Sequence, residues 1–146
     1  MKKIIIGNWK LNLDHLEAIQ LLQKLNYTIE EGKEEKIDIV VSPSHTSLRS
    51  IQTIIDTDKL NIQLSAQDVS QFSGGAYTGE VSSHQLNKLN VNYCIVGHSE
   101  RRIEFNESDE VINQKVHNLV SEGITPIVCF GETLEQRNSN QYLEHI

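Results

Sequence analysis

An apolar run, Tyr93-Cys94-Ile95-Val96, leads directly into the polar sequence Gly97-His98-Ser99-Glu100-Arg101-Arg102. A short run of this kind is typical of a strand buried inside a parallel sheet. In parallel α/β folds, the loops at the carboxyl ends of the strands form the crevice where ligands bind. The stretch therefore predicts a strand that delivers His98 to a functional rim.

A second stretch near the N-terminus has the same design. The apolar Ile4-Ile5-Ile6 is followed by Gly7-Asn8-Trp9-Lys10. Because the carboxyl ends of parallel strands meet at one edge, we expect Asn8 and Lys10 to share a rim with His98. A lysine there would bring a compact positive charge to a phosphate or an enediolate. An isolated lysine or histidine is more often a solvated or packed side chain than a functional one. The prediction of a functional rim therefore rests on the two strand ends taken together.

Five apolar runs of strand length alternate along the chain with segments whose apolar residues recur at helical spacing. The helical segments begin near Leu16, Leu48 and Ser108. The strands show no alternation of apolar and polar residues, which predicts burial on both faces. This pattern predicts an α/β fold of repeated βα units, and it fits an open doubly wound sheet as well as a barrel. The strands are expected at residues 3–7, 37–42, 62–66, 93–97 and 125–130.

Composition excludes several classes of protein. The net charge of −7 opposes nucleic-acid binding, which draws on clustered Lys and Arg side chains. No apolar run approaches the roughly 18 residues that suggest a membrane span, and the run after Lys2-Lys3 is too short for an export signal. A cytoplasmic protein without a membrane partner is expected. Cys94 and Cys129 lie in apolar runs and are expected to be small packed side chains rather than members of a disulfide or metal site.

Four motifs resemble the signatures of the triosephosphate isomerase family, and they occur in the order in which the family has them. They are Gly7-Asn8-Trp9-Lys10-Leu11-Asn12, Gly74-Gly75-Ala76-Tyr77-Thr78-Gly79-Glu80, the His98 motif quoted above, and Pro126-Ile127-Val128-Cys129-Phe130-Gly131-Glu132. The resemblance implies a (β/α)8 TIM barrel, a fold of about 250 residues. Residues 1–146 are then expected to be the N-terminal part of one barrel domain. This part has about five βα units and stops in the helix after the fifth strand.

The resemblance also implies a function. The family interconverts dihydroxyacetone phosphate and D-glyceraldehyde 3-phosphate through an enediolate, in glycolysis and gluconeogenesis, with no cofactor and no metal. In the family, a neutral histidine at a helix N-terminus polarises the substrate carbonyl, which gives that catalytic role to His98. Lys10 would act in both binding and catalysis, and Asn8 would orient the substrate by hydrogen bonding. Glu100 would balance the charge of Lys10, and Ser99 would help to set the resting position of the catalytic base.

Two further residues are placed by the same resemblance. Glu107 is expected to tie loops of the barrel together, with a simple helix N-terminal carboxylate as the alternative. In the family, the loop that corresponds to residues 74–80 protrudes into a neighbouring subunit, so Thr78 is expected to serve homodimerisation. The alternative is a mobile lid or a plain surface loop. The run lacks the Gly-x-Gly-x-x-Gly order of a phosphate-binding loop.

The residue that moves the proton is expected to be missing. Isomerisation needs a positioned carboxylate, and the family's glutamate base follows the sixth strand. The 146-residue chain alone is therefore expected to be inactive. Its fold is expected to be marginal, because the first and fifth strands would be open edges and Tyr142, Leu143 and Ile146 would form an uncovered apolar face. The alternatives are a non-catalytic truncated relative that acts by subunit association and another phosphate-sugar barrel enzyme.

Overall fold

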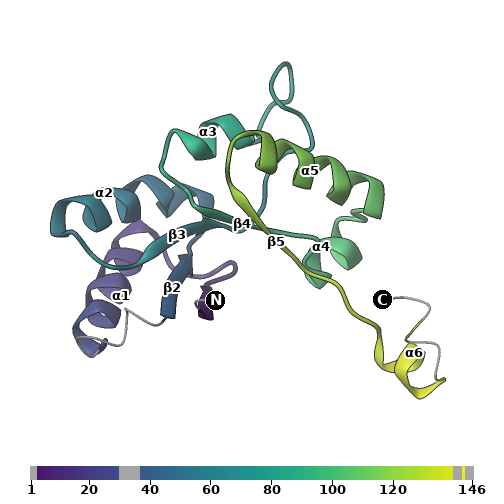
Figure 1. Cartoon of the computed structure of the whole chain (residues 1–146), viewed down its shortest axis with the longest axis horizontal. Helices are drawn as coiled ribbons and strands as arrows, with labels where there is room; N and C mark the ends of the chain where they lie inside the picture. Colours follow the sequence, from purple (N-terminus) through teal and green to yellow (C-terminus); the bar gives the residue numbers. More distant parts are fainter. Residues whose placement is uncertain (1–2, 30–36, 140–142, 144–146) are drawn as a thin grey trace.

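The computed structural model of the chain describes residues 3–29, 37–139 and 143. Its strands form one parallel sheet, whose order in space, β1-β2-β3-β4-β5, repeats their order along the chain. The sheet curls, and the longer helices lie on one side of it (Figure 1). The strands are β1 (Lys3–Asn8), β2 (Ile37–Ser42), β3 (Gln63–Ala66), β4 (Tyr93–Val96) and β5 (Thr125–Val128).

Helices lie between successive strands, and one more helix follows β5. They are α1 (His15–Thr28), the 3-10 turn η1 (His45–Ser47), α2 (Leu48–Asp58), α3 (Ser83–Asn87), α4 (Ser99–Glu104), α5 (Asp109–Ser121) and α6 (Leu134–Asn138). A doubly wound sheet would reverse its strand order and carry helices on both faces. The unbroken strand order and the curl instead confirm the predicted fold, five βα units of an incomplete (β/α)8 barrel.

Local sequence explains where these elements begin and end. The Ser108 hydroxyl accepts a hydrogen bond from the Val111 N–H and caps α5, which confirms the predicted helix entry. Strand β4 stops one residue earlier than predicted, because Gly97 adopts a left-handed φ of 69°. Strand β5 likewise ends at Val128, two residues before the predicted end. The core lies between the sheet and the helices, where Leu22, Ile51, Leu64, Val96 and Leu119 are buried.

The prediction that every strand is buried on both faces was wrong for the two outer strands. Ile4 and Ile5 of β1 are 47% and 58% exposed, and Val128 of β5 is 46% exposed. Helices cover only one side of the curled sheet, so side chains of the outer strands on the other side meet no described neighbour that buries them. Leu16 and Val120, apolar residues at helical spacing in two of the expected helical segments, are also exposed.

The predicted helix after the fifth strand begins at Leu134, as α6, and runs to Asn138. Its predicted apolar face includes Tyr142 and Ile146, which lie outside the described residues, while Leu143 is 78% exposed. Among the residues that the structure describes, no helix has both the length and the apolar character needed to cross a membrane.

Candidate active site

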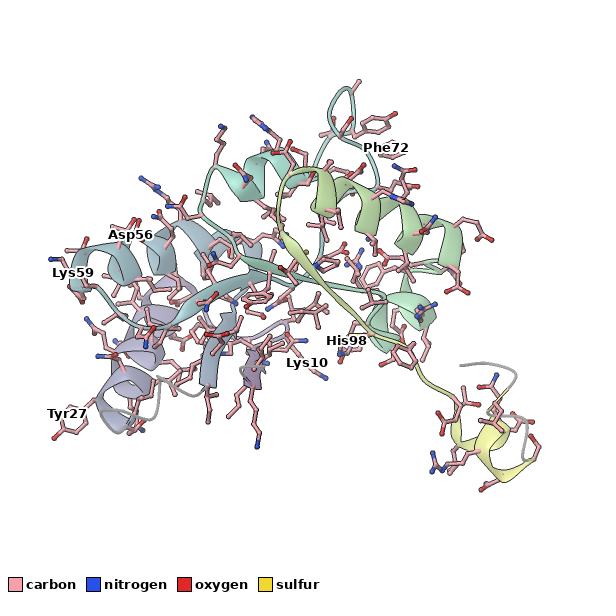
Figure 2. The ribbon with its side chains drawn as sticks, in the orientation of Figure 1. Lys10, Tyr27, Asp56, Lys59, Phe72 and His98 are labelled. Atoms are coloured by element: carbon pink, nitrogen blue, oxygen red, sulfur yellow. The ribbon has the colours of Figure 1, made fainter. Side chains whose placement is uncertain are left out.

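The ends of β1 and β4 bring the three predicted substrate-contacting residues into one cavity. Asn8, Lys10 and His98 all line a hollow of about 520 Å³ at the rim formed by the carboxyl ends of the strands. Figure 2 shows Lys10 and His98 near each other at this rim. The cavity is also lined by Leu11, Asn12, His45, Gln67, Asp68, Glu100, Arg101, Glu104 and Phe105. The rim predicted from the strand ends is thus present.

His98 caps the short helix α4. The backbone N–H of Glu100 donates a hydrogen bond to Nδ1 of His98 over 3.2 Å. Oε2 of the Glu100 carboxylate also lies 3.4 Å from Nδ1, and this contact would favour a proton on that nitrogen. The backbone amide can only donate, and its hydrogen bond is the shorter of the two contacts, so we assign Nδ1 as an acceptor. A neutral ring then carries its proton on Nε2, where it can donate to a ligand oxygen.

Lys10 holds an uncommon backbone conformation. Its φ is 54°, in the left-handed region that residues with a Cβ atom rarely adopt. The side-chain Oδ1 of Asn8 accepts a hydrogen bond from the Lys10 N–H over 2.9 Å. At the other end of the side chain, Nζ donates to Oε1 of Glu100 over 2.6 Å. This hydrogen bond from Lys10 lowers the pKa of Glu100 below its ordinary value, as expected for a carboxylate that balances the lysine charge.

The turn that delivers His98 requires glycine. A Cβ atom at Gly97 would lie 3.1 Å from each of three atoms, on Arg102, Ile112 and Cys129, and the φ of 69° adds backbone strain. Arg102 reinforces the turn, because its Nε donates to the Gly97 carbonyl over 2.8 Å. Its Nη2 donates to the Cys129 carbonyl over 3.3 Å. One guanidinium therefore joins the ends of β4 and β5 beside the histidine.

A buried charge cluster (Asp68, Arg101, Glu107 and Lys115) is centred on the buried Lys115 and reaches the rim cavity through Asp68 and Arg101. Nζ of Lys115 bonds Oδ1 of Asp68 over 2.7 Å and also bonds Glu107. Nε of Arg101 lies 3.0 Å from Oδ2 of Asp68 and 2.7 Å from Oε1 of Glu107. The cluster ties the loop after β3 to α4 and α5, which confirms the tying role predicted for Glu107.

Burial affects the two carboxylates of the cluster differently. For Asp68, burial raises the pKa above its ordinary value despite the hydrogen bond from Lys115. For Glu107, burial also acts to raise the pKa, but the hydrogen bonds from Lys115 and Arg101 outweigh it and the pKa is lowered. The pKa values of the two carboxylates are therefore displaced in opposite directions. Sequence reasoning missed Asp68 and Arg101; the signal was Lys115, a charged residue on the otherwise apolar face of α5.

The remaining predicted residues occupy separate places. Thr78 lies in the exposed loop of residues 74–80, which projects from the molecule and does not line the cavity (Figure 1). Ser99 is the exposed first residue of α4. Cys94 and Cys129 are free thiols, and Cys94 is fully buried, as predicted for a small packed side chain. Burial raises the pKa of Cys94 well above its ordinary value, which keeps the thiol protonated.

Comparison with known proteins agrees with this geometry. The sequence model of the triosephosphate isomerase family matches residues 3–146. Triosephosphate isomerase of Saccharopolyspora erythraea is 50% identical over 142 residues, which cover 97% of this chain and 54% of that protein. Triosephosphate isomerase of Corynebacterium glutamicum is 49% identical over 145 residues, 99% of this chain and 56% of that protein.

A third relative, the triosephosphate isomerase of Streptomyces coelicolor, is 46% identical over 142 residues, which cover 97% of this chain and 55% of that protein. The chain thus spans about half the length of the curated relatives that it matches. The family match covers almost every residue, including those that line the rim cavity. This chain therefore belongs to the triosephosphate isomerase family.

Proposed function

We propose that the protein that contains this chain interconverts dihydroxyacetone phosphate and D-glyceraldehyde 3-phosphate through an enediolate, as a cytoplasmic enzyme of glycolysis and gluconeogenesis. The observation that carries the proposal is the convergence of Asn8, Lys10 and His98 on one cavity. The reaction moves protons between two carbons and two oxygens, and the proposal includes neither a cofactor nor a metal.

Each residue has a step that its geometry suits. The Lys10 ammonium attracts the anionic substrate and stabilises the negative charge that develops in the enediolate. The Nε2 proton of His98 is donated in a hydrogen bond to the substrate carbonyl oxygen, so the oxygen gains charge as the carbon loses its proton. Asn8 supports both steps. Its side-chain oxygen Oδ1 accepts a hydrogen bond from the Lys10 N–H, and its side-chain NH2 group can donate to the substrate.

Three carboxylates near His98, those of Glu100, Asp68 and Glu107, are poorly suited to remove the carbon proton. Glu100 is bonded to Lys10, and its lowered pKa makes it a weaker base. Asp68 and Glu107 are occupied within the buried charge cluster. We propose that the base is a glutamate beyond these five βα units, that residues 1–146 are the N-terminal part of one barrel domain, and that this part is inactive by itself.

Homodimerisation through the loop of residues 74–80 is also proposed. The loop is exposed, yet it carries ordered aromatic packing, because the rings of Phe72 and Tyr77 stack with centroids 3.6 Å apart. Ordered apolar surface of this kind suits burial against a second copy. Sedimentation of the full-length protein tests the proposal: Thr78→Arg should shift it from dimer to monomer, while Lys88→Arg on the surface should not.

The experiment that tests the enzymatic proposal is a coupled isomerase assay with glyceraldehyde 3-phosphate. It compares the full-length gene product, residues 1–146 alone, and residues 1–146 mixed with a separately expressed remainder. Activity in the first and third samples, without activity in the second, is expected. Activity of residues 1–146 alone would overturn the proposed place of the base. Absence of activity in every folded sample would instead favour a non-catalytic protein that acts by subunit association.

A further inference from the structure

The side-chain amide of Gln67 joins three strand ends. Gln67 directly follows β3, and its Nε2 donates to the Lys10 carbonyl over 2.9 Å and to the Ser42 carbonyl over 2.8 Å. Ser42 is the last residue of β2, and its carbonyl also accepts the Trp9 N–H over 3.1 Å. The polypeptide leaving β1 is therefore fastened to β2 and to β3 through one NH2 group.

Lys10 needs such a hold, because a left-handed backbone costs a residue with a Cβ atom about 1–2 kcal/mol. Conformations of this kind persist only where the surroundings enforce them. Asn8 binds the N–H of Lys10, and Gln67 binds its carbonyl, so the residue is held on both sides. From this backbone, Nζ reaches Glu100 and lines the cavity.

We infer that Gln67 is a positioning residue that places the Lys10 ammonium in the active site. The inference rests on the proposed function for its kinetic consequence, although not for its structural one. Glutamine suits the task because both hydrogens of one amide can donate to the two carbonyls. A glutamate has the same shape but presents only acceptors, and a methionine has a similar length without any donor.

The first test follows the Lys10 backbone amide in the full-length protein by NMR hydrogen exchange. Gln67→Met and Gln67→Glu should each speed its exchange by about tenfold or more, since loss of the clamp opens the segment locally. Gln63→Met is the matched control, because Gln63 is the first residue of β3 and its side-chain amide bonds Asp38 instead. Unchanged exchange at Lys10 in folded Gln67 variants would overturn the inference, whether or not the protein is an isomerase.

The second test is a double-mutant cycle on isomerase activity. Gln67→Met should lower kcat/KM by about tenfold in the otherwise native enzyme, because small misplacements of a catalytic group are costly. In a Lys10→Ala background the same change should lower it by less than about twofold, since the residue to be positioned is gone. Equal losses in both backgrounds would show that Gln67 acts independently of Lys10 and would overturn the inference. A native enzyme without activity would refute the proposed function, and hydrogen exchange would still decide the role of Gln67.

Discussion

Nζ of Lys10 lies 2.6 Å from Oε1 of Glu100, although 90 positions separate the two residues along the chain. Lys10 follows β1 and Glu100 follows β4, and two strands stand between these in the sheet. In a flat sheet, β1 and β4 would lie about 14 Å apart. The curl of the sheet shortens this span enough for one lysine and one glutamate to bridge it, so the ion pair is a product of the barrel geometry.

The pair predicts how Glu100 titrates. Because the hydrogen bond from Lys10 lowers its pKa, Glu100 should stay ionised to a lower pH than an ordinary glutamate. The stability that this ionisation contributes is present above the pKa of the unfolded chain and is lost as the pH falls through the folded pKa. A carbon-13 NMR titration of the side chain measures this pKa. Lys10→Ala should bring it back toward the ordinary value, and a pKa unaffected by that change would contradict the assigned cause.

Replacement of Lys10 by alanine should weaken substrate binding and turnover together in the full-length enzyme. Both the substrate phosphate and the enediolate are anionic, so one ammonium serves the ground state and the transition state. Lys59→Ala is the matched control, since Lys59 shares a left-handed backbone, with φ of 53°, and lies far from the rim (Figure 2). Steady-state kinetics give both constants. A Lys10→Ala enzyme with native KM would refute the binding role.

His98→Gln should lower kcat by about 100-fold or more while KM changes only a few-fold. The contact of His98 with the carbonyl oxygen strengthens as charge develops there, so its loss is felt mainly in the transition state. His84→Gln is the control, because His84 lies on α3 beside Glu122 and outside the cavity. Both variants are compared with the native enzyme over a range of substrate concentrations. Native turnover in His98→Gln would remove this residue from the mechanism.

Gly97→Ala should destabilise the protein by about 1–3 kcal/mol, through the left-handed φ and the crowding of the added Cβ. Gly74→Ala serves as the comparison, because a Cβ at Gly74 meets nothing within 4 Å. Its effect should stay within about 0.5 kcal/mol. Urea denaturation of the full-length protein measures both changes. Equal stabilities of the two variants would show that the turn before His98 tolerates a side chain.

Lys115→Met should cost about 1–3 kcal/mol, because Asp68 and Glu107 lose the more buried of their two shared cations and keep only Arg101. Lys88→Met, at an exposed position, should cost little. Adding Glu107→Gln to Lys115→Met should recover part of the loss, because Arg101 is then left with one carboxylate, Asp68, instead of two. Thermal and urea denaturation would report these differences. A cluster that contributes nothing would give equal stabilities for Lys115→Met and Lys88→Met.

Patterns that are local in the sequence predicted much of this structure. Each strand was found within two residues of its expected ends, because short apolar runs carry the signal themselves. The meeting of Lys10 and His98 was also predictable, since parallel strands must present their carboxyl ends at one edge. The left-handed backbone of Lys10 was not predicted, because the cost is met by Asn8 and by the distant Gln67.

Contacts between polar side chains that are far apart along the chain were harder to predict from the sequence. Asp68 and Lys115 are 47 positions apart, and neither neighbourhood indicates the other. A lysine at an apolar position of a helix does predict a buried counter-charge, but not which carboxylate supplies it. Exposure of Ile4 and Val128 was missed for a different reason. The first and fifth strands were expected to be open edges, but an apolar run does not reveal that one face of such a strand is left uncovered.

The strand order has a consequence for synthesis of the chain. Each strand pairs with the one made just before it, so every addition to the sheet closes a loop of only a few tens of residues. Each strand therefore needs only the part of the chain that precedes it, and polypeptides emerge from the ribosome N-terminus first. The nascent polypeptide can therefore form the strands β1 to β5 one after another, each pairing with the strand made before it. Translation itself would then set the order in which the strands of the curled sheet are added.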